Sequence, residues 1–379
     1  MIYFDNAATT LQKPATVLKA IGECAAHYGA NPGRSGHRLS MLAGQKVYEC
    51  REQAAQLFGA EPENVVFTEN CTHALNIAIK GVMQSGGHVI ISDLEHNSVF
   101  RPVYHLAKGK NVTFSIAEVF EGDFAKTLRS FERNITTQTR LIACTAGSNL
   151  CGIMLPCDAL YTLCKRYNLL LLLDLAQSAG VVKSSLAGAD FLCMPGHKGL
   201  YGPTGTGMLI TNKGEMLDTI MEGGTGSQSY LADQPQIMPD KLESGTLNTY
   251  GIMGLREGMR FISTFGVDKI YKHELTLTQQ LYDGLSKIKG IRLYTERPQQ
   301  GTHLPVLCFN VGDSRSEAVV EELSKRGFAL RGGYHCAPLA HNKLGTNENG
   351  AVRASFSMFN TPDQVQRLLF ELKRMKEPA

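Results

Sequence analysis

The sequence lacks the features that mark membrane proteins, secreted proteins and nucleic-acid binders. Its most apolar run, residues 169–173, stops at Asp174 and is far too short to span a bilayer. The chain begins MIYFDN, without the basic and apolar segments of a secretory signal. It has no long run of like charges, and its formal net charge is only +3. We therefore expect neither a nucleic acid nor a membrane as a partner.

The 10 cysteines include no C-x-x-C pair, which argues against a disulfide scaffold and a structural zinc site. Cys144, Cys151, Cys157 and Cys164 look regularly spaced, but strand and helix patterns alternate around them, so their side chains should point in different directions. We expect most cysteines to be buried as small apolar residues in a reducing cytoplasm, and we expect no metal site.

The remaining composition is that of an ordinary globular protein, and 379 residues predict two or three structural units. Short apolar runs at 64–68, 88–92, 140–144 and 168–174 alternate with amphipathic stretches. Strands that alternate with helices predict an α/β fold with a mostly parallel sheet.

The pattern changes after residue 265. An amphipathic stretch at 268–288 precedes expected strands at 291–294 and 305–311, and helices follow at 316–325 and 362–375. We therefore predict a large domain over residues 1–265, whose N-terminal segment packs on a smaller α+β domain over residues 266–379.

Three features point to chemistry together, although each has an ordinary structural explanation alone. Asp174 ends an apolar strand, where α/β enzymes place catalytic groups but where a capping aspartate is also common. Cys71 and Thr72 precede a helical stretch at 74–83, so they lie where a helix N-terminus can bind an anion. Lys198 follows Gly196 and His197 and precedes a glycine-rich run that lacks the order of a nucleotide-binding loop.

A lysine, a strand-end carboxylate and an anion-binding helix start are the groups that pyridoxal 5'-phosphate requires. The lysine holds the aldehyde, the carboxylate keeps the ring nitrogen protonated, and the helix start binds the phosphate. The sequence therefore predicts a pyridoxal-phosphate enzyme.

Short motifs with the same order and spacing as in a known family extend this prediction. They are Tyr3-Phe-Asp-Asn-Ala-Ala8, Asn31-Pro-Gly-Arg34-Ser-Gly-His37, Glu95-His96-Asn97, Ser148-Asn149-Leu-Cys-Gly152, Asp174-Leu-Ala-Gln177, Gly196-His197-Lys198, Glu243-Ser-Gly-Thr246 and Arg331-Gly-Gly-Tyr-His-Cys336. With them, the chain resembles the cysteine desulfurases of the class V aminotransferase family, over nearly its whole length. The resemblance implies the pyridoxal-phosphate fold type I, with a seven-stranded, mostly parallel sheet.

The resemblance also implies roles at the cofactor. Lys198 matches the Schiff-base lysine, His96 the histidine that stacks on the ring and assists proton transfer, and Asp174 the partner of the ring nitrogen. The remaining cofactor contacts are Asn149 and Gln177 at the ring and its phenolic oxygen, and Thr72, Cys71 and His197 at the phosphate. Thr246 matches a threonine that reaches the phosphate of a neighbouring subunit, which implies a homodimer with shared active sites.

Cys336 matches the cysteine that attacks the sulfur of the substrate. It follows two glycines that permit movement, and its basic neighbours His335 and Arg331 should favour the thiolate. The Arg-Gly-x-x-His-Cys context resembles the SUF-type branch, which has a short catalytic loop. Arg353, Asn149 and Arg331 are the expected substrate contacts, with Arg353 binding the carboxylate.

Three positions depart from the family pattern around the phosphate. Pro195 replaces a serine, Gly199 resembles an insertion, and Cys71 stands where threonine is frequent. We expect backbone N–H groups to contribute more of the phosphate anchoring.

The function implied is an L-cysteine desulfurase that releases L-alanine and leaves a persulfide on Cys336 for transfer to an acceptor protein. The alternatives are a selenocysteine lyase, a class V transaminase or epimerase, and a non-catalytic scaffold with this fold. No motif distinguishes iron–sulfur cluster assembly, tRNA thiolation or selenium metabolism as the pathway.

Overall fold

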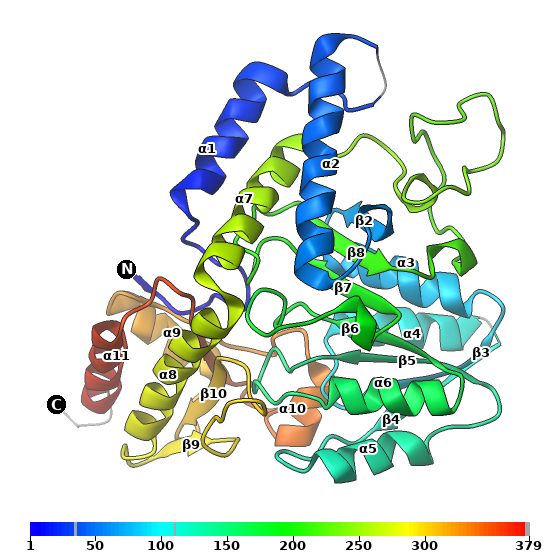
Figure 1. The fold of residues 1–379 in the computed structure, drawn as a ribbon. Helices are drawn as coiled ribbons and strands as arrows, with labels where there is room; N and C mark the ends of the chain where they lie inside the picture. Colours follow the sequence, from blue (N-terminus) through cyan, green and yellow to red (C-terminus); the bar gives the residue numbers. More distant parts are fainter. Residues whose placement is uncertain (34–35, 110, 376–379) are drawn as a thin grey trace.

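The computed structural model describes residues 1–33, 36–109 and 111–375, and a seven-stranded sheet lies at its centre (Figure 1). Strand β8 is antiparallel to both of its neighbours, β2 and β7, while the other adjacent strands are parallel. In sheet order the strands are β2 (Val65–Thr68), β8 (Gly207–Thr211), β7 (Phe191–Pro195), β6 (Leu170–Asp174), β5 (Thr139–Thr145), β3 (Gly87–Ser92) and β4 (Val112–Ala117). This confirms the predicted α/β fold with a mostly parallel sheet.

Helices cover both faces of the sheet, and successive side chains of each strand point to opposite faces. In β6, Leu171 and Leu173 pack in the core beneath α2, α6 and α7, while Leu172 packs in the core beneath α3 and α4. Burial on both faces explains the continuous apolar run in the sequence. The helices of this part are α1 (Ala15–Glu23), α2 (Arg38–Phe58), α3 (Cys71–Met83), α4 (Asn97–Gly109), α5 (Phe124–Arg133), α6 (Cys157–Arg166) and α7 (Thr249–Phe265).

The C-terminal part has its own sheet and core. The strands β9 (Ile291–Leu293), β10 (Val306–Val311) and β12 (Val352–Ser355) form an antiparallel sheet with β10 in the middle. The other elements are α8 (Val267–Leu285), α9 (Ser316–Lys325), β11 (Phe328–Ala329), α10 (Pro338–Leu344) and α11 (Pro362–Arg374).

The N-terminus lies beside this C-terminal part (Figure 1). Strand β1 (Ile2–Tyr3) pairs with β11 in parallel, and Phe4 is fully buried in the same core as Phe309. Gly266 separates α7 from α8, next to the predicted boundary at residue 265. The division into two domains itself stays a prediction.

Helix α3 begins three residues earlier than predicted, and this difference shapes the site. Asn70 caps the helix, because its side-chain oxygen accepts a hydrogen bond from the His73 N–H at 3.0 Å. Cys71 and Thr72 therefore lie in the first turn, where backbone N–H groups have no partner within the helix.

Two further expectations concern the whole chain. All ten cysteines are free, and Cys336 alone is exposed among those the structure describes. Within the described residues, the membrane search finds no helix with the length and apolar character needed to cross a bilayer.

Candidate active site

A cavity of about 230 Å³ brings together every predicted site residue except Thr246. These residues are Cys71, Thr72, His96, Asn149, Asp174, Gln177, His197, Lys198, Arg331, Cys336 and Arg353. They come from the carboxyl ends of central strands, the start of α3 and the C-terminal part of the chain. The cavity is thus a junction between segments that are far apart in sequence.

Lys198 reaches the cavity from the turn that follows β7. Its Nζ makes no hydrogen bond or ion pair among the described residues. Burial, with a further contribution from the Arg353 charge, lowers the pKa of Lys198 to about 8. A substantial fraction of its amine is therefore neutral near physiological pH, as a nucleophile or base requires.

Asp174 ends β6 and is almost fully buried. Its Oδ1 accepts hydrogen bonds from the Ala176 N–H at 2.8 Å and the Cys71 thiol at 3.4 Å. Burial raises the pKa of Asp174, while these two donors and the Lys198 charge oppose that shift. Its Oδ2 has no hydrogen-bond partner within the described chain.

His96 is held by a residue that the sequence analysis missed. The Ser98 N–H donates to His96 Nδ1 at 3.0 Å, and the Ser98 hydroxyl lies 2.9 Å from the same nitrogen and 2.7 Å from Thr72 Oγ1. Burial lowers the pKa of His96 to about 4, so the ring is neutral. Because Nδ1 accepts, the ring proton belongs on Nε2. A serine two residues beyond His96 was the available sequence signal.

Glu95, beside His96, is a second buried group without a predicted role. Its carboxyl group accepts hydrogen bonds from the Thr145 N–H at 3.0 and 3.1 Å and also from the Ser92 hydroxyl. Burial raises the pKa of Glu95 to about 8. These bonds connect the ends of β3 and β5 and thereby position the segment that carries His96.

The polar groups in the cavity fit the predicted cofactor. Asn149 Oδ1 and His197 Nδ1 are buried and have no hydrogen-bond partner among the described residues, which is costly unless a ligand or water supplies one. Within the described part of the chain, the Lys198 amine and Asp174 Oδ2 also have no partner. The first turn of α3 offers backbone N–H groups to an anion. An amine, a carboxylate oxygen and an anion site are the groups that pyridoxal phosphate requires.

Arg353 is almost fully buried in β12. One terminal nitrogen donates to Asp5 Oδ1 at 2.7 Å, and the other donates to the Asn149 backbone oxygen at 2.8 Å. Its Nε has no partner among residues 1–33, 36–109 and 111–375. Asp5 thus fixes the guanidinium of a residue that lines the cavity. The sequence analysis quoted Asp5 only as part of a motif.

The loop that carries Cys336 is tied to the large part of the chain. The Cys336 backbone oxygen accepts from the Asn97 N–H at 2.7 Å, and that of His335 accepts from Asn149 Nδ2 at 2.8 Å. Both His335 and Cys336 have positive φ angles, of 51° and 53°. Residues other than glycine seldom adopt this conformation, which costs on the order of 1 kcal/mol or more each.

The expectation that His335 supplies positive charge to Cys336 is wrong. Burial, with the charge of Arg353, lowers the pKa of His335 to about 2, so the ring is neutral. It stacks on His341, with ring centroids 5.6 Å apart. Gly332 and Gly333 also have a structural role, because Gly333 takes a φ of 96° and a side chain at Gly332 would meet the backbone of Ser316.

The remaining expectations concern two residues of the phosphate region, Thr246 and Pro195, and one motif residue, Arg34. Thr246 is exposed and lies outside the cavity. Pro195 lines the cavity without a hydroxyl, and the hydroxyl side chains that line it are those of Thr72, Ser98 and Thr145. Arg34, in the quoted motif at 31–37, lies outside the described residues.

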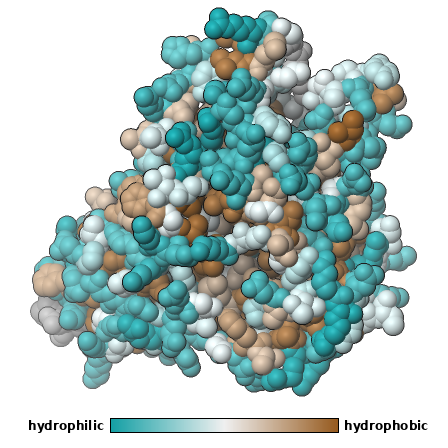
Figure 2. All heavy atoms as spheres, viewed as in Figure 1, coloured by the Kyte–Doolittle hydropathy of each residue, from teal (hydrophilic) through white to brown (hydrophobic). Residues whose placement is uncertain are grey.

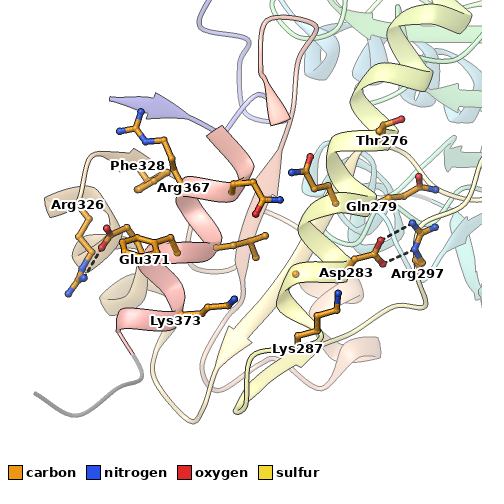
Figure 3. A pocket seen from close by; sticks show the side chains of 15 residues that line it. Thr276, Gln279, Asp283, Lys287, Arg297, Arg326, Phe328, Arg367, Glu371 and Lys373 are labelled. Atoms are coloured by element: carbon orange, nitrogen blue, oxygen red, sulfur yellow. Dashed lines mark hydrogen bonds and ion pairs between the residues drawn. The ribbon is translucent and has the colours of Figure 1, made fainter. Parts of the chain in front are cut away.

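Two larger hollows lack the chemistry of this cavity. One, of about 1060 Å³, lies between α8 and α11 and contains the ion pairs Arg297–Asp283 and Arg326–Glu371 (Figure 3). The other, of about 1020 Å³, is lined largely by apolar groups such as Leu173, and apolar side chains gather near the end of α2 in Figure 2. Neither contains a predicted site residue.

Comparison with known proteins relates nearly the whole chain to one protein family. The aminotransferase class-V family model matches residues 2–368. The chain is 33% identical to a probable cysteine desulfurase of Methanothermobacter thermautotrophicus, covering 97% of this chain and 92% of that protein. It is 34% identical to a probable cysteine desulfurase of Pyrococcus abyssi, covering 99% and 94%.

A solved structure gives the same result. The apo cysteine desulfurase of Thermococcus onnurineus NA1 matches with a TM-score of 0.90 and 31% identity, covering 99% of this chain and 94% of that one. The predicted pyridoxal-phosphate fold type I is thereby confirmed.

Proposed function

Because the chain belongs to the class V aminotransferase family, we propose that it is a pyridoxal-phosphate-dependent cysteine desulfurase. In this proposal, L-cysteine becomes L-alanine and its sulfur is left on Cys336. One observation carries it: the exposed Cys336 lines the same cavity as Lys198 and Asp174. A transaminase would need the lysine and the aspartate but not the thiol.

The ring would be held by Asp174 at its nitrogen, His96 at its face, and Asn149 and Gln177 at the ring and its phenolic oxygen. Lys198 would lie at the aldehyde carbon, and Thr72 and His197 at the phosphate. When bound, pyridoxal phosphate supplies a sink for the electron pair that remains at Cα after its proton is removed. Lys198 is the base for that proton, since its lowered pKa leaves the amine partly neutral. Arg353 orients the substrate through its carboxylate.

Cys336 performs the sulfur transfer. Its thiolate sulfur forms a bond to the sulfur of the substrate while the Cβ–S bond of the substrate breaks. The electron pair of that bond stays with the carbon fragment, which takes up a proton and leaves as alanine. The product on the protein is a Cys336 persulfide, and the exposed position of Cys336 makes it accessible to an acceptor protein.

The remaining partners are part of the same proposal. Thr246 is exposed and outside its own cavity, which supports a role at the phosphate of a second subunit in a homodimer. We place the enzyme in a reducing cytoplasm, where its free cysteines would stay reduced.

The test is the release of alanine and sulfide from L-cysteine by the protein purified with pyridoxal phosphate. We expect Cys336→Ala to lower sulfide release at least about 100-fold, since it lacks the nucleophile. Cys157→Ala is the matched control, because Cys157 is partly buried and outside this cavity, and it should retain full activity.

Each alternative predicts a different result. Sulfide release that survives Cys336→Ala would contradict the assignment of the nucleophile. Turnover of L-selenocysteine without turnover of L-cysteine would identify a selenocysteine lyase, and a requirement for a 2-oxo acid would identify a transaminase.

A further inference from the structure

Cys71 has a contact that neither its sequence position nor its place at the anion site predicts. Cys71 is the first residue of α3, the helix that follows β2, and β2 is three positions from the strand of Asp174 in the sheet order. Its Sγ nevertheless lies 3.4 Å from Asp174 Oδ1. Both side chains are buried, with exposed fractions of 7% and 2%. The side chain of Cys71 is therefore engaged with the carboxylate.

The hydrogen bonds on Asp174 are unevenly divided between its two oxygens. Oδ1 accepts from both the Ala176 N–H and the Cys71 thiol, while Oδ2 accepts from no described residue. Two donors on one oxygen fix the rotation of the carboxylate about its Cβ–Cγ bond. The second oxygen then remains available on a residue that lines the cavity.

The thiol of Cys71 acts as a donor because it keeps its proton. Burial, with the negative charge of Asp174, raises its pKa well above the ordinary value. A thiol is a weak donor, but a charged acceptor in a buried site strengthens the bond. It also costs less to bury than a hydroxyl, which suits its position in the apolar core under α3.

Cys193 shows that burial near Asp174 is not sufficient for this contact. It is a fully buried thiol on β7, directly paired with Asp174 across the sheet. Its sulfur makes no hydrogen bond among the described residues. The chain thus offers a matched control one strand away from the carboxylate.

We propose that Cys71 is a positioning residue whose S–H group holds Asp174 Oδ1, so that Asp174 Oδ2 is presented to the ring nitrogen of the cofactor. The proposal rests on the proposed function, because it concerns the same cofactor. In this proposal Cys71 acts on Asp174, the partner of the ring nitrogen, and does not contact the phosphate.

The first measurement is the infrared S–H stretching band of the full-length protein without cofactor. A hydrogen-bonded thiol absorbs at lower frequency than a free one. The difference spectrum between the unaltered protein and Cys71→Ala should contain a low-frequency band, and the corresponding spectrum for Cys193→Ala should contain a band at higher frequency. Equal frequencies for the two thiols would overturn the proposal.

The second measurement is the dissociation constant for pyridoxal phosphate. Cys71→Ala should weaken binding about 3- to 10-fold, because a carboxylate that is no longer held must be ordered as the cofactor binds. Cys71→Ser restores a donor and should return the constant to within about twofold, while Cys193→Ala should leave it unchanged. Unchanged binding in Cys71→Ala would overturn the proposal.

These readouts separate the two proposals. If the protein released no alanine from L-cysteine, the proposed function would fail, yet the infrared band and the cofactor affinity would still decide the role of Cys71. If Cys71→Ala did not fold, the band would be followed in Asp174→Asn, where a neutral acceptor should shift it to higher frequency. An unshifted band there would also contradict the proposal.

Discussion

Cys71 and Cys336 line the same cavity and differ in almost every physical respect. Cys71 is buried at the start of a helix, bonded to Asp174, with a pKa held well above the ordinary thiol value. Cys336 is exposed on a loop with two consecutive positive φ angles at residues other than glycine. Cysteine therefore occurs in this cavity in two opposite environments, one buried and hydrogen-bonded and the other exposed.

The difference shows that the surroundings of a cysteine set the reactivity of its thiol. The α3 wall, with Cys71, Thr72 and Asp174, presents fixed groups suited to a cofactor. The Cys336 loop and its neighbour Arg353 present groups suited to a substrate. We expect changes in the two regions to separate cofactor binding from substrate turnover.

The largest expected difference is in the alkylation rates of the two thiols. In the cofactor-free protein, iodoacetamide should modify Cys336 at least about 100-fold faster than Cys71, because Cys71 is inaccessible and remains protonated. The rates can be measured by mass spectrometry of peptides taken at successive times. Similar rates would mean that the α3 wall opens readily, and the contrast between the two regions would be lost.

A change at Arg353 should affect substrate turnover and leave cofactor binding intact. We expect Arg353→Gln to lower kcat/KM about 10- to 100-fold through the loss of a charge-assisted contact to the substrate carboxylate. The dissociation constant for pyridoxal phosphate should stay within about twofold. Arg297→Gln, which breaks an ion pair outside the cavity, is the control and should change neither quantity. If Arg353→Gln weakened cofactor binding as much as it lowers kcat/KM, the two regions would not have separate roles.

The last predicted effect is on stability, and it arises at Lys198, which lines the same cavity as the α3 wall. Below pH 8 the folded protein must bury the charged form of Lys198, whose pKa falls from 10.5 to about 8 on folding. Between pH 8 and 10.5 the unfolded chain binds more protons, so the free energy of unfolding rises with pH. Lys198→Met should therefore stabilise the cofactor-free protein by about 3 kcal/mol at pH 7.

That gain should shrink as the pH rises through the window from 8 to 10.5, as urea unfolding at several pH values can measure. Lys269→Met, at an exposed position, should show no such dependence. A gain for Lys198→Met that is constant with pH would show that packing, and not the buried charge, is its cause.

Much of the fold could be predicted from the sequence because its signals are local. The apolar run before Asp174 and the alternation of strands and helices are visible without any tertiary contact, and the helix at 316–325 is observed with the same bounds. Strand β6 begins later than predicted because Asn168 adopts a left-handed turn at φ 53°. The start of α3 was missed because the cap depends on one hydrogen bond, which the Asn70 side-chain oxygen accepts from the His73 N–H.

The site was predictable where a motif identifies the residue, and less so where its surroundings determine its state. Lys198, Asp174 and Cys336 were expected together and do share a cavity. His335 was expected to be charged because histidine titrates near neutral pH, but its burial against His341 and near Arg353 keeps it neutral. Ser98 was overlooked because a serine in a helix usually has no such role.

The order of strands and helices and the family motifs follow from residue type and spacing along the chain, and so do the proposed roles of Lys198, Asp174 and Cys336. Two hydrogen bonds are visible only in the tertiary structure: the one that Cys71 donates to Asp174 and the one that Arg353 donates to Asp5. Those contacts join residues 103 and 348 positions apart in the chain. Burial and hydrogen bonding set the protonation state of a group, and both arise only when distant segments pack together.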